Sequence, residues 1–122
     1  MFRYLTLALI TASISTVSSV VLAQSGMPRA NRQGDYYDYN SRYWIVIDTT
    51  GLNCRSGPGS NYRIVQKFDN NDKLLAPTQS GEPLIRRDRR GKPWLAVSPN
   101  GYQYETSCYV RANQSFIRPI PY

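Results

Sequence analysis

The sequence of 122 residues contains no histidine. Histidine is the commonest general base and the commonest metal ligand, so its absence removes the usual catalytic triads and metal sites. The sequence also lacks a G-x-S-x-G turn and a phosphate-binding G-x-x-x-x-G-K-[ST] loop. We therefore expect a protein that is not an enzyme and that has no cofactor and no metal. A small hydrolase that uses carboxylates is the enzymatic alternative, although no spacing places two of the candidates together: Asp48, Asp69, Asp72, Glu82 and Glu105.

No window shows the sustained apolar repeat of an amphipathic helix. Short runs rich in β-branched and aromatic residues alternate instead with Gly, Pro, Asn and Asp, which predicts strands separated by turns. The sequence thus predicts one all-β domain over residues 43–122, a small barrel of about five to seven short strands. The expected strands are Tyr43–Asp48, Leu52–Arg55, Tyr62–Phe68, Lys73–Ala76, Leu84–Asp88, Trp94–Val97 and Ser107–Arg111.

The first residues have the pattern of a secretory signal peptide. Arg3 gives a positive start, and the run from Leu5 to Leu22 is apolar and uncharged. Val21 and Ala23 then provide the small residues of a cleavage site. We expect residues 1–23 to be removed and the protein to be exported, to the periplasm or outside the cell. The alternative is an uncleaved membrane anchor, since the uncharged stretch almost reaches the roughly 20 residues that span a bilayer.

Residues 24–42 are poor in aliphatic side chains and rich in Gly, Asn, Ser, Gln and charge, which predicts a flexible linker. Its tyrosines, Tyr36, Tyr37 and Tyr39, are expected to rest on the domain or to remain free. Contact with a sugar or a protein partner is the alternative.

The chain has two cysteines, Cys54 and Cys108. An even pair in an oxidising compartment favours a disulfide, and two unrelated buried thiols are the alternative. Closing a loop of this length would stabilise the fold by about 4 kcal/mol at most. Alternation in the segment Leu52–Arg55 places Cys54 on the same face as Leu52, which we expect to point inward.

The net charge of +7 favours an anionic partner. Export makes nucleic acid a poor candidate and anionic envelope polymers or lipid headgroups better ones. The strongest local feature is a predicted basic hairpin, where arginines form bidentate contacts with phosphate, sulfate or carboxylate. A solvated hairpin whose charges only aid solubility is the alternative. The predicted anion-binding residues are Arg86, Arg87, Arg89, Arg90 and Lys92.

The segment GLNCRSGPGSNYRIVQKF resembles the opening motif of bacterial SH3-like domains, a short strand followed by a Ser-Gly-Pro turn and a second strand. PWLAV and CYVRANQSFIRPI resemble later strands of that family, and the resemblance covers about Trp44 to Ile120. Two features depart from the family pattern: cysteines occupy positions 54 and 108, and the basic stretch is longer than a simple hairpin tip. The residues that match the opening motif are Leu52, Asn53, Arg55, Ser56, Gly57, Pro58 and Tyr62.

The resemblance implies an SH3-like barrel whose first and last core strands lie close together, so that Cys54 meets Cys108. It also implies a shallow groove that recognises peptides or cell-wall peptidoglycan, because aromatic rings stack on sugars and on extended peptides. Packing or isolated exposure of each ring is the alternative, and the opening motif has sufficient structural reasons of its own. The predicted ligand-binding rings are Tyr62, Trp94, Tyr102, Tyr104 and Tyr109.

Together these features predict a non-enzymatic exported binding module for peptidoglycan or another envelope ligand, with possible peripheral contact to an anionic envelope. The alternative from another class is an accessory or inhibitory subunit that docks on an exported protein. Fold alone does not decide between them.

Overall fold

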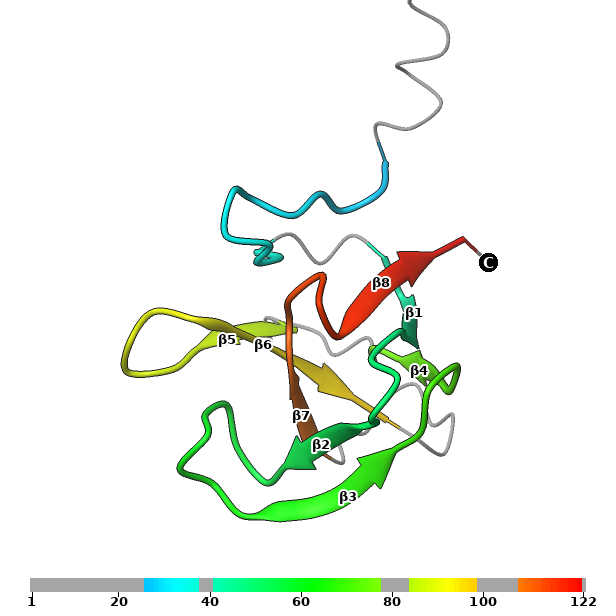
Figure 1. The fold of residues 1–122 in the computed structure, drawn as a ribbon. Coiled ribbons are helices and arrows are strands. Elements are labelled where there is room, and N and C mark those ends of the chain that lie inside the picture. Colours follow the sequence, from blue (N-terminus) through cyan, green and yellow to red (C-terminus); the bar gives the residue numbers. More distant parts are fainter. Residues whose placement is uncertain (1–25, 38–40, 78–83, 99–107, 122) are drawn as a thin grey trace, which may run out of the picture.

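The structure is a computed structural model that describes residues 26–37, 41–77, 84–98 and 108–121. Within these ranges the chain forms eight strands and no helix, which confirms the all-β prediction (Figure 1). The strands are β1 (Tyr43–Val46), β2 (Leu52–Arg55), β3 (Ile64–Phe68), β4 (Lys73–Leu75), β5 (Ile85–Arg87), β6 (Pro93–Val97), β7 (Cys108–Arg111) and β8 (Ile117–Ile120).

Strand β8 lies in the closing segment, for which the sequence predicted no separate strand. Pro119 lies within it and cannot donate a backbone hydrogen bond. The strand tolerates this proline because it forms the edge of its sheet, where one side of the backbone needs no partner. Pro119 lies opposite Trp44 of β1.

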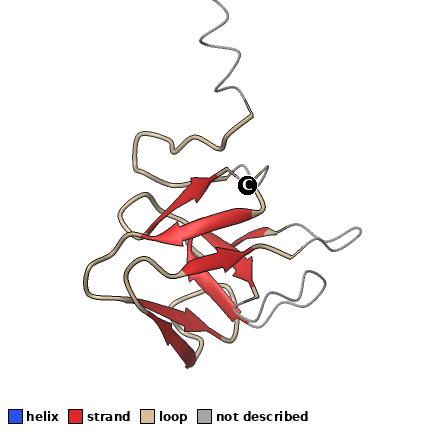
Figure 2. Cartoon of the chain, turned by 90° about the vertical axis from the view of Figure 1, so that its right-hand side faces the viewer, coloured by secondary structure: helices blue, strands red, loops and turns tan. Residues whose placement is uncertain are grey.

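The strands form two antiparallel sheets, one of three strands in the order β4-β1-β8 and one of five strands in the order β3-β2-β7-β6-β5. Figure 2 shows the same domain at right angles to Figure 1, with strands and connecting segments and no helix in the described residues. A single bridge between Leu75 and Ser98 adds a contact from β4 to the end of β6. The two sheets therefore share one small core.

The core is built from the inward positions of alternating strands. Trp44 and Val46 of β1 are fully buried; Trp44 lies opposite Leu74 of β4, and Val46 lies opposite Ile117 of β8. Strand β6 contributes all five of its residues, PWLAV, to the buried set. The predicted alternation of β2 is confirmed, because Leu52 and Cys54 are buried while their neighbours are partly exposed.

The disulfide between Cys54 and Cys108 is confirmed, with a Cα–Cα distance of 5.5 Å. It joins β2 to β7, which pair only through Arg55 and Tyr109. The covalent bond thus strengthens the shortest ladder of the five-stranded sheet. A disulfide also fits the oxidising compartment that export would provide.

Residues 26–37, which we call the N-terminal strap, lie against the domain although they belong to the expected linker. Asp35 forms a bridge with Asn113, and the Tyr36 N–H donates to the Ala112 carbonyl at 2.9 Å. The Tyr36 ring packs edge-on against Trp44, with ring centroids 5.0 Å apart. Composition predicted a linker because aliphatic residues are scarce; one buried ring and one buried carboxylate dock the segment instead.

Within the described ranges, no helix is long and apolar enough to cross a membrane. The expected signal peptide, residues 1–23, lies outside those ranges, as does Tyr39 of the expected linker.

Candidate functional site

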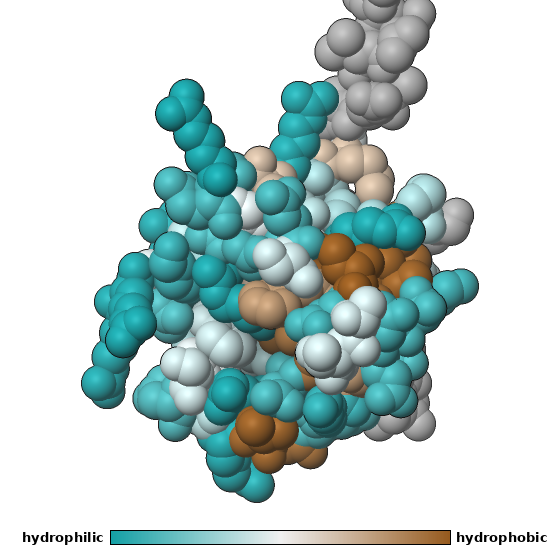
Figure 3. All heavy atoms as spheres, in the orientation of Figure 1, coloured by the Kyte–Doolittle hydropathy of each residue, from teal (hydrophilic) through white to brown (hydrophobic). Residues whose placement is uncertain are grey.

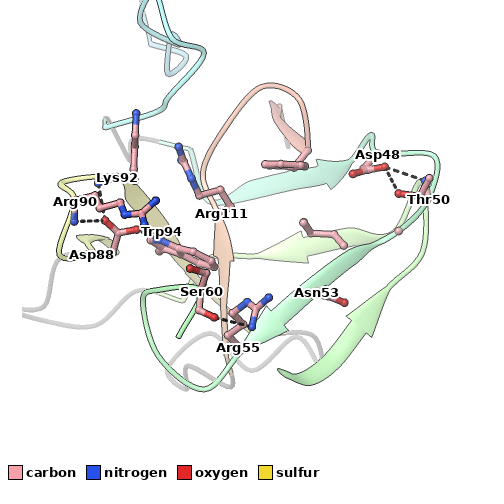
Figure 4. A pocket seen from close by; sticks show the side chains of 13 residues that line it. Asp48, Thr50, Asn53, Arg55, Ser60, Asp88, Arg90, Lys92, Trp94 and Arg111 are labelled. Carbon is pink, nitrogen blue, oxygen red and sulfur yellow. Dashed lines mark hydrogen bonds between the residues drawn. The ribbon is translucent and has the colours of Figure 1, made fainter. Parts of the chain in front are cut away.

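A cleft of about 550 Å³ opens between β2, the turn that joins β5 to β6, and β7 (Figure 4). Leu52, Trp94 and Phe116 provide its apolar lining. Four cations also line it, and we call them the basic end: Arg55, Arg90, Lys92 and Arg111. Figure 4 shows that these cations lie around Trp94, whereas Asp48 and Thr50 lie at the opposite end of the cleft.

Arg111 is fixed by the N-terminal strap. Its Nη2 donates to Asp35 Oδ1 at 2.6 Å, and its Nη1 donates to the Pro93 carbonyl at 3.1 Å. Lys92 Nζ lies 3.6 Å from the other Asp35 oxygen. The Asp35 carboxylate thus contacts two cations of the basic end, and its single negative charge cannot neutralise both.

The carboxylate of Asp35 is only 2% exposed. Burial by itself raises its pKa, but hydrogen bonds from Asn113 and Arg111 and the charges of Arg111 and Lys92 outweigh burial, so the pKa is lowered. Asp35 is therefore ionised at neutral pH. The strap contributes a permanent negative charge behind the basic end and holds Arg111 in one orientation.

Asp88 organises the turn between β5 and β6. Its Oδ1 accepts the backbone N–H groups of Arg90 and Lys92 at 2.8 and 3.0 Å. Its Oδ2 accepts the Trp94 indole N–H at 3.0 Å. Burial by itself raises the pKa of Asp88, but these three hydrogen bonds and the charge of Arg111 outweigh burial, so the pKa is lowered. Asp88 therefore positions Arg90 and Lys92, and its carboxylate, which also lines the cleft, offsets part of the charge of the basic end.

Arg55 and Arg90 make no ion pair with any described residue. Arg55 Nη1 donates instead to the backbone carbonyls of Ser60 and Tyr62, at 3.1 and 2.9 Å. Neutral carbonyls hold the guanidinium in place without cancelling its charge. A phosphate, sulfate or carboxylate entering the cleft would meet these two arginines with their charge available.

The structure divides the predicted basic hairpin into two groups. Arg90 and Lys92 line the cleft, whereas the other three cations are not among the described residues that do so: Arg86, Arg87 and Arg89. The Arg87 guanidinium lies over the Tyr37 ring, 4.7 Å from its centroid, where it helps to hold the strap. Tyr37 itself donates its hydroxyl to the Gly91 carbonyl at 2.7 Å.

The predicted aromatic residues are not brought together in one groove by the described parts of the chain. Trp94 lines the cleft but is only 5% exposed, and its N–H is bound to Asp88, so little of the ring can stack on a ligand. Tyr62 is exposed near the start of β3 and Tyr109 is half-buried in β7, and neither lines the cleft. Tyr102 and Tyr104 lie outside the described residues.

Arg55, Arg111, Asp35 and Asp88 were not predicted as parts of this site. The alternation of β2 and β7 contained part of the signal. Arg55 lies opposite Tyr109, and Arg111 lies two residues further along the same strand, so the two arginines share the face that points away from Cys54 and Val110. The contribution of Asp35 depends on docking of the strap, which local sequence does not reveal.

Among the described residues, no three His, Cys, Asp or Glu side chains gather where they could hold a metal ion. No family model matches the chain, and no curated protein matches it significantly. The resemblance to bacterial SH3-like domains therefore stays a prediction from the motifs of the sequence.

Proposed function

We propose that this protein is an exported, non-enzymatic binding module of the bacterial SH3-like kind that holds an acidic segment of a cell-wall or other envelope polymer in the cleft. The basic end of the cleft is the observation that carries the proposal. Its cations come from β2, the β5–β6 turn and β7, so the fold brings together charges that are distant in sequence.

The arrangement of charges supports an anionic ligand rather than an uncharged sugar. Arg55 and Arg90 have no carboxylate partner among the described residues, and Asp35 is shared between Arg111 and Lys92. The net charge of +7 adds a long-range attraction for anionic polymers. The apolar lining formed by Leu52 and Phe116 offers a surface for the uncharged part of the same ligand.

The test is co-sedimentation of the purified protein with purified peptidoglycan over a range of salt concentrations. We expect salt-sensitive pelleting, because contacts between exposed charges weaken as ionic strength rises. Pelleting that does not change with salt would instead favour recognition by aromatic rings. If the protein stays in the supernatant at every salt concentration, the proposal fails and a protein partner becomes the leading hypothesis.

A matched pair of variants locates the binding site. Arg90→Glu reverses a charge that lines the cleft, and Arg89→Glu makes the same change in an exposed neighbour outside it. We expect Arg90→Glu to weaken binding about tenfold or more, from the loss of one charge-assisted hydrogen bond. Arg89→Glu should change it about twofold at most, as expected for a charge at the rim. Equal effects of the two variants would show that net charge, rather than the cleft, drives binding.

A further inference from the structure

The end of the cleft that faces away from Trp94 carries a negative charge. Asp48 and Thr50 line this end, which we call the acidic end (Figure 4). The Thr50 hydroxyl and backbone N–H both donate to Asp48 Oδ1, at 2.7 and 2.9 Å. Asp48 Oδ2 accepts no hydrogen bond from any described residue. One carboxylate oxygen is therefore available to a ligand.

The Asp48 carboxylate is ionised at neutral pH. Hydrogen bonds from the Thr50 side chain and backbone lower its pKa, and so does the charge of Lys67; together they outweigh burial, which raises it. Lys67 acts from a distance, since both residues are described and no ion pair joins them. A cationic group that enters this end of the cleft would meet a charged carboxylate that forms no ion pair with any described residue.

Uncharged residues line the cleft between its two ends. They include Leu52, Asn53 and Phe116. The Asn53 side chain lies on the same face of β2 as Arg55 and makes no hydrogen bond with any described residue. Figure 3 shows hydrophilic residues over the β5–β6 turn and apolar residues toward the middle of the same face. An amide offers both donors and an acceptor, so Asn53 is suited to a peptide group of a ligand.

The separation of the two ends sets the length of a ligand that reaches both. Strand β2 runs between them: the Asp48 carbonyl accepts the N–H of Gly51, just before the strand, and Arg55 is the last residue of the strand. A strand advances about 3.3 Å per residue, so Leu52 and Arg55 lie about 10 Å apart. The amine and the carboxylate of a free amino acid share one carbon and cannot span this distance. An extended peptide of about three residues can.

We propose that the cleft binds a short extended peptide segment in one orientation, with a carboxylate at the basic end and a free amine at the acidic end. Asn53 contacts a peptide group between them. The inference rests on the function proposed above and makes it more specific, because the ligand carries charges of both signs and is not simply acidic. In peptidoglycan, the peptides attached to the sugar strands are the part that carries both groups.

Selective acetylation of the free amines of purified peptidoglycan tests the acidic end. Acetylation makes the polymer more anionic, so it would strengthen binding if overall attraction to a basic protein controlled the affinity. We expect it instead to weaken the affinity measured by co-sedimentation about threefold or more, from the loss of one ion pair. Unchanged or stronger binding would overturn the two-ended ligand and leave the proposed function standing. If untreated peptidoglycan does not pellet the protein at all, both proposals fail.

The variant Asp48→Asn locates the amine. Asparagine keeps an oxygen that accepts the hydrogen bonds from Thr50 but removes the charge. The variant is more basic than the wild type, so overall charge predicts tighter binding to untreated peptidoglycan, whereas loss of the amine contact predicts binding about threefold weaker. Asp69→Asn makes the same charge change at an exposed residue outside the cleft and should not weaken binding. Equal effects of the two variants would overturn the role of Asp48.

Acetylation and substitution can also be combined. Asp48→Asn should bind untreated and acetylated peptidoglycan equally, because the contact that acetylation removes is already absent. If acetylation weakens the variant as much as the wild type, the amine binds elsewhere and the proposal fails. Asn53→Ala should weaken binding to untreated peptidoglycan about threefold, from the loss of one hydrogen bond. Asn61→Ala, exposed and outside the cleft, is its control; equal affinities of these two variants would overturn the contact with a peptide group.

Discussion

Replacement of Asp35 by asparagine tests whether the N-terminal strap is part of the folded domain. The Asp35 carboxylate accepts hydrogen bonds from Arg111 and Asn113 at 2.6 and 2.9 Å and lies 3.6 Å from Lys92 Nζ. Asparagine keeps the size of the side chain but removes the charge. The substitution leaves Arg111, whose side chain is only 19% exposed, without its counter-ion.

We expect Asp35→Asn to lower the free energy of unfolding by about 2 kcal/mol, the contribution typical of a hydrogen bond to a charged group. The full cost of breaking a buried ion pair, about 3–5 kcal/mol, is too large here because Lys92 and Arg111 keep contact with water. Urea denaturation followed by tryptophan fluorescence, with the disulfide intact, measures the difference. Arg89→Gln is the control, because that side chain is exposed and makes no ion pair or side-chain hydrogen bond with a described residue; its effect should be close to zero.

The stability that Asp35 contributes should also depend on pH in a definite direction. Folding lowers the pKa of Asp35 below its ordinary value of 3.8, so the unfolded state binds more protons than the folded state in the acid range. The contribution of Asp35 is therefore complete above pH 3.8 and is lost as the pH falls through the lowered pKa. The difference between wild type and Asp35→Asn should shrink in that range. A difference that is absent at pH 7, or that persists unchanged at low pH, would refute the assigned role of Asp35.

Three further predictions concern stability, each measured by urea denaturation. Replacing both Cys54 and Cys108 by alanine should lower the free energy of unfolding by up to about 4 kcal/mol, since the bridge closes a long loop; no loss would mean that the sheet holds β2 and β7 together without it. Trp94→Phe should cost about 1.5 kcal/mol, because Asp88 loses the indole N–H, and an unchanged midpoint would contradict that role. Gly91→Ala should lower the free energy of unfolding by about 1 kcal/mol, because its φ is 80°. Gly51→Ala should lower it by more, because its φ is 91° and its Cβ would also lie 2.9 Å from the Phe68 carbonyl oxygen. Equal losses would contradict the close approach at Gly51.

The strands could be predicted because alternation is a local pattern, and the disulfide could be predicted because the chain has only two cysteines. Alternation in Leu52–Arg55 correctly placed Cys54 inward, and a single pair of cysteines allowed one intramolecular pairing. Strand β8 was not predicted, because Pro119 is compatible with a strand only at the edge of a sheet. Whether a strand lies at an edge is known only once the sheet is assembled.

The site was harder to predict because its charges meet only after folding. The run of cations from Arg86 to Lys92 is conspicuous in the sequence, yet only Arg90 and Lys92, in the turn that Asp88 organises, line the cleft. Arg55 and Arg111 are single cations in separate strands and carry no local signal of a site. Asp35 lies in a segment whose polar composition predicts a linker, and only long-range contacts fix its position.

The pairing of β1 with β8 has a consequence for when the domain can form during synthesis. Val46 at the end of β1 lies opposite Ile117, so the first strand acquires this neighbour only after nearly all of the domain has been made. Until then Trp44 lacks its β8 neighbour, Pro119, and one side of β1 remains open to other chains. Local hairpins such as β2 with β3 can form early, but closure of the small sheet must wait for the last residues of the domain. Chains that stop before β8 should therefore be targets for proteases, because they cannot bury their most central tryptophan.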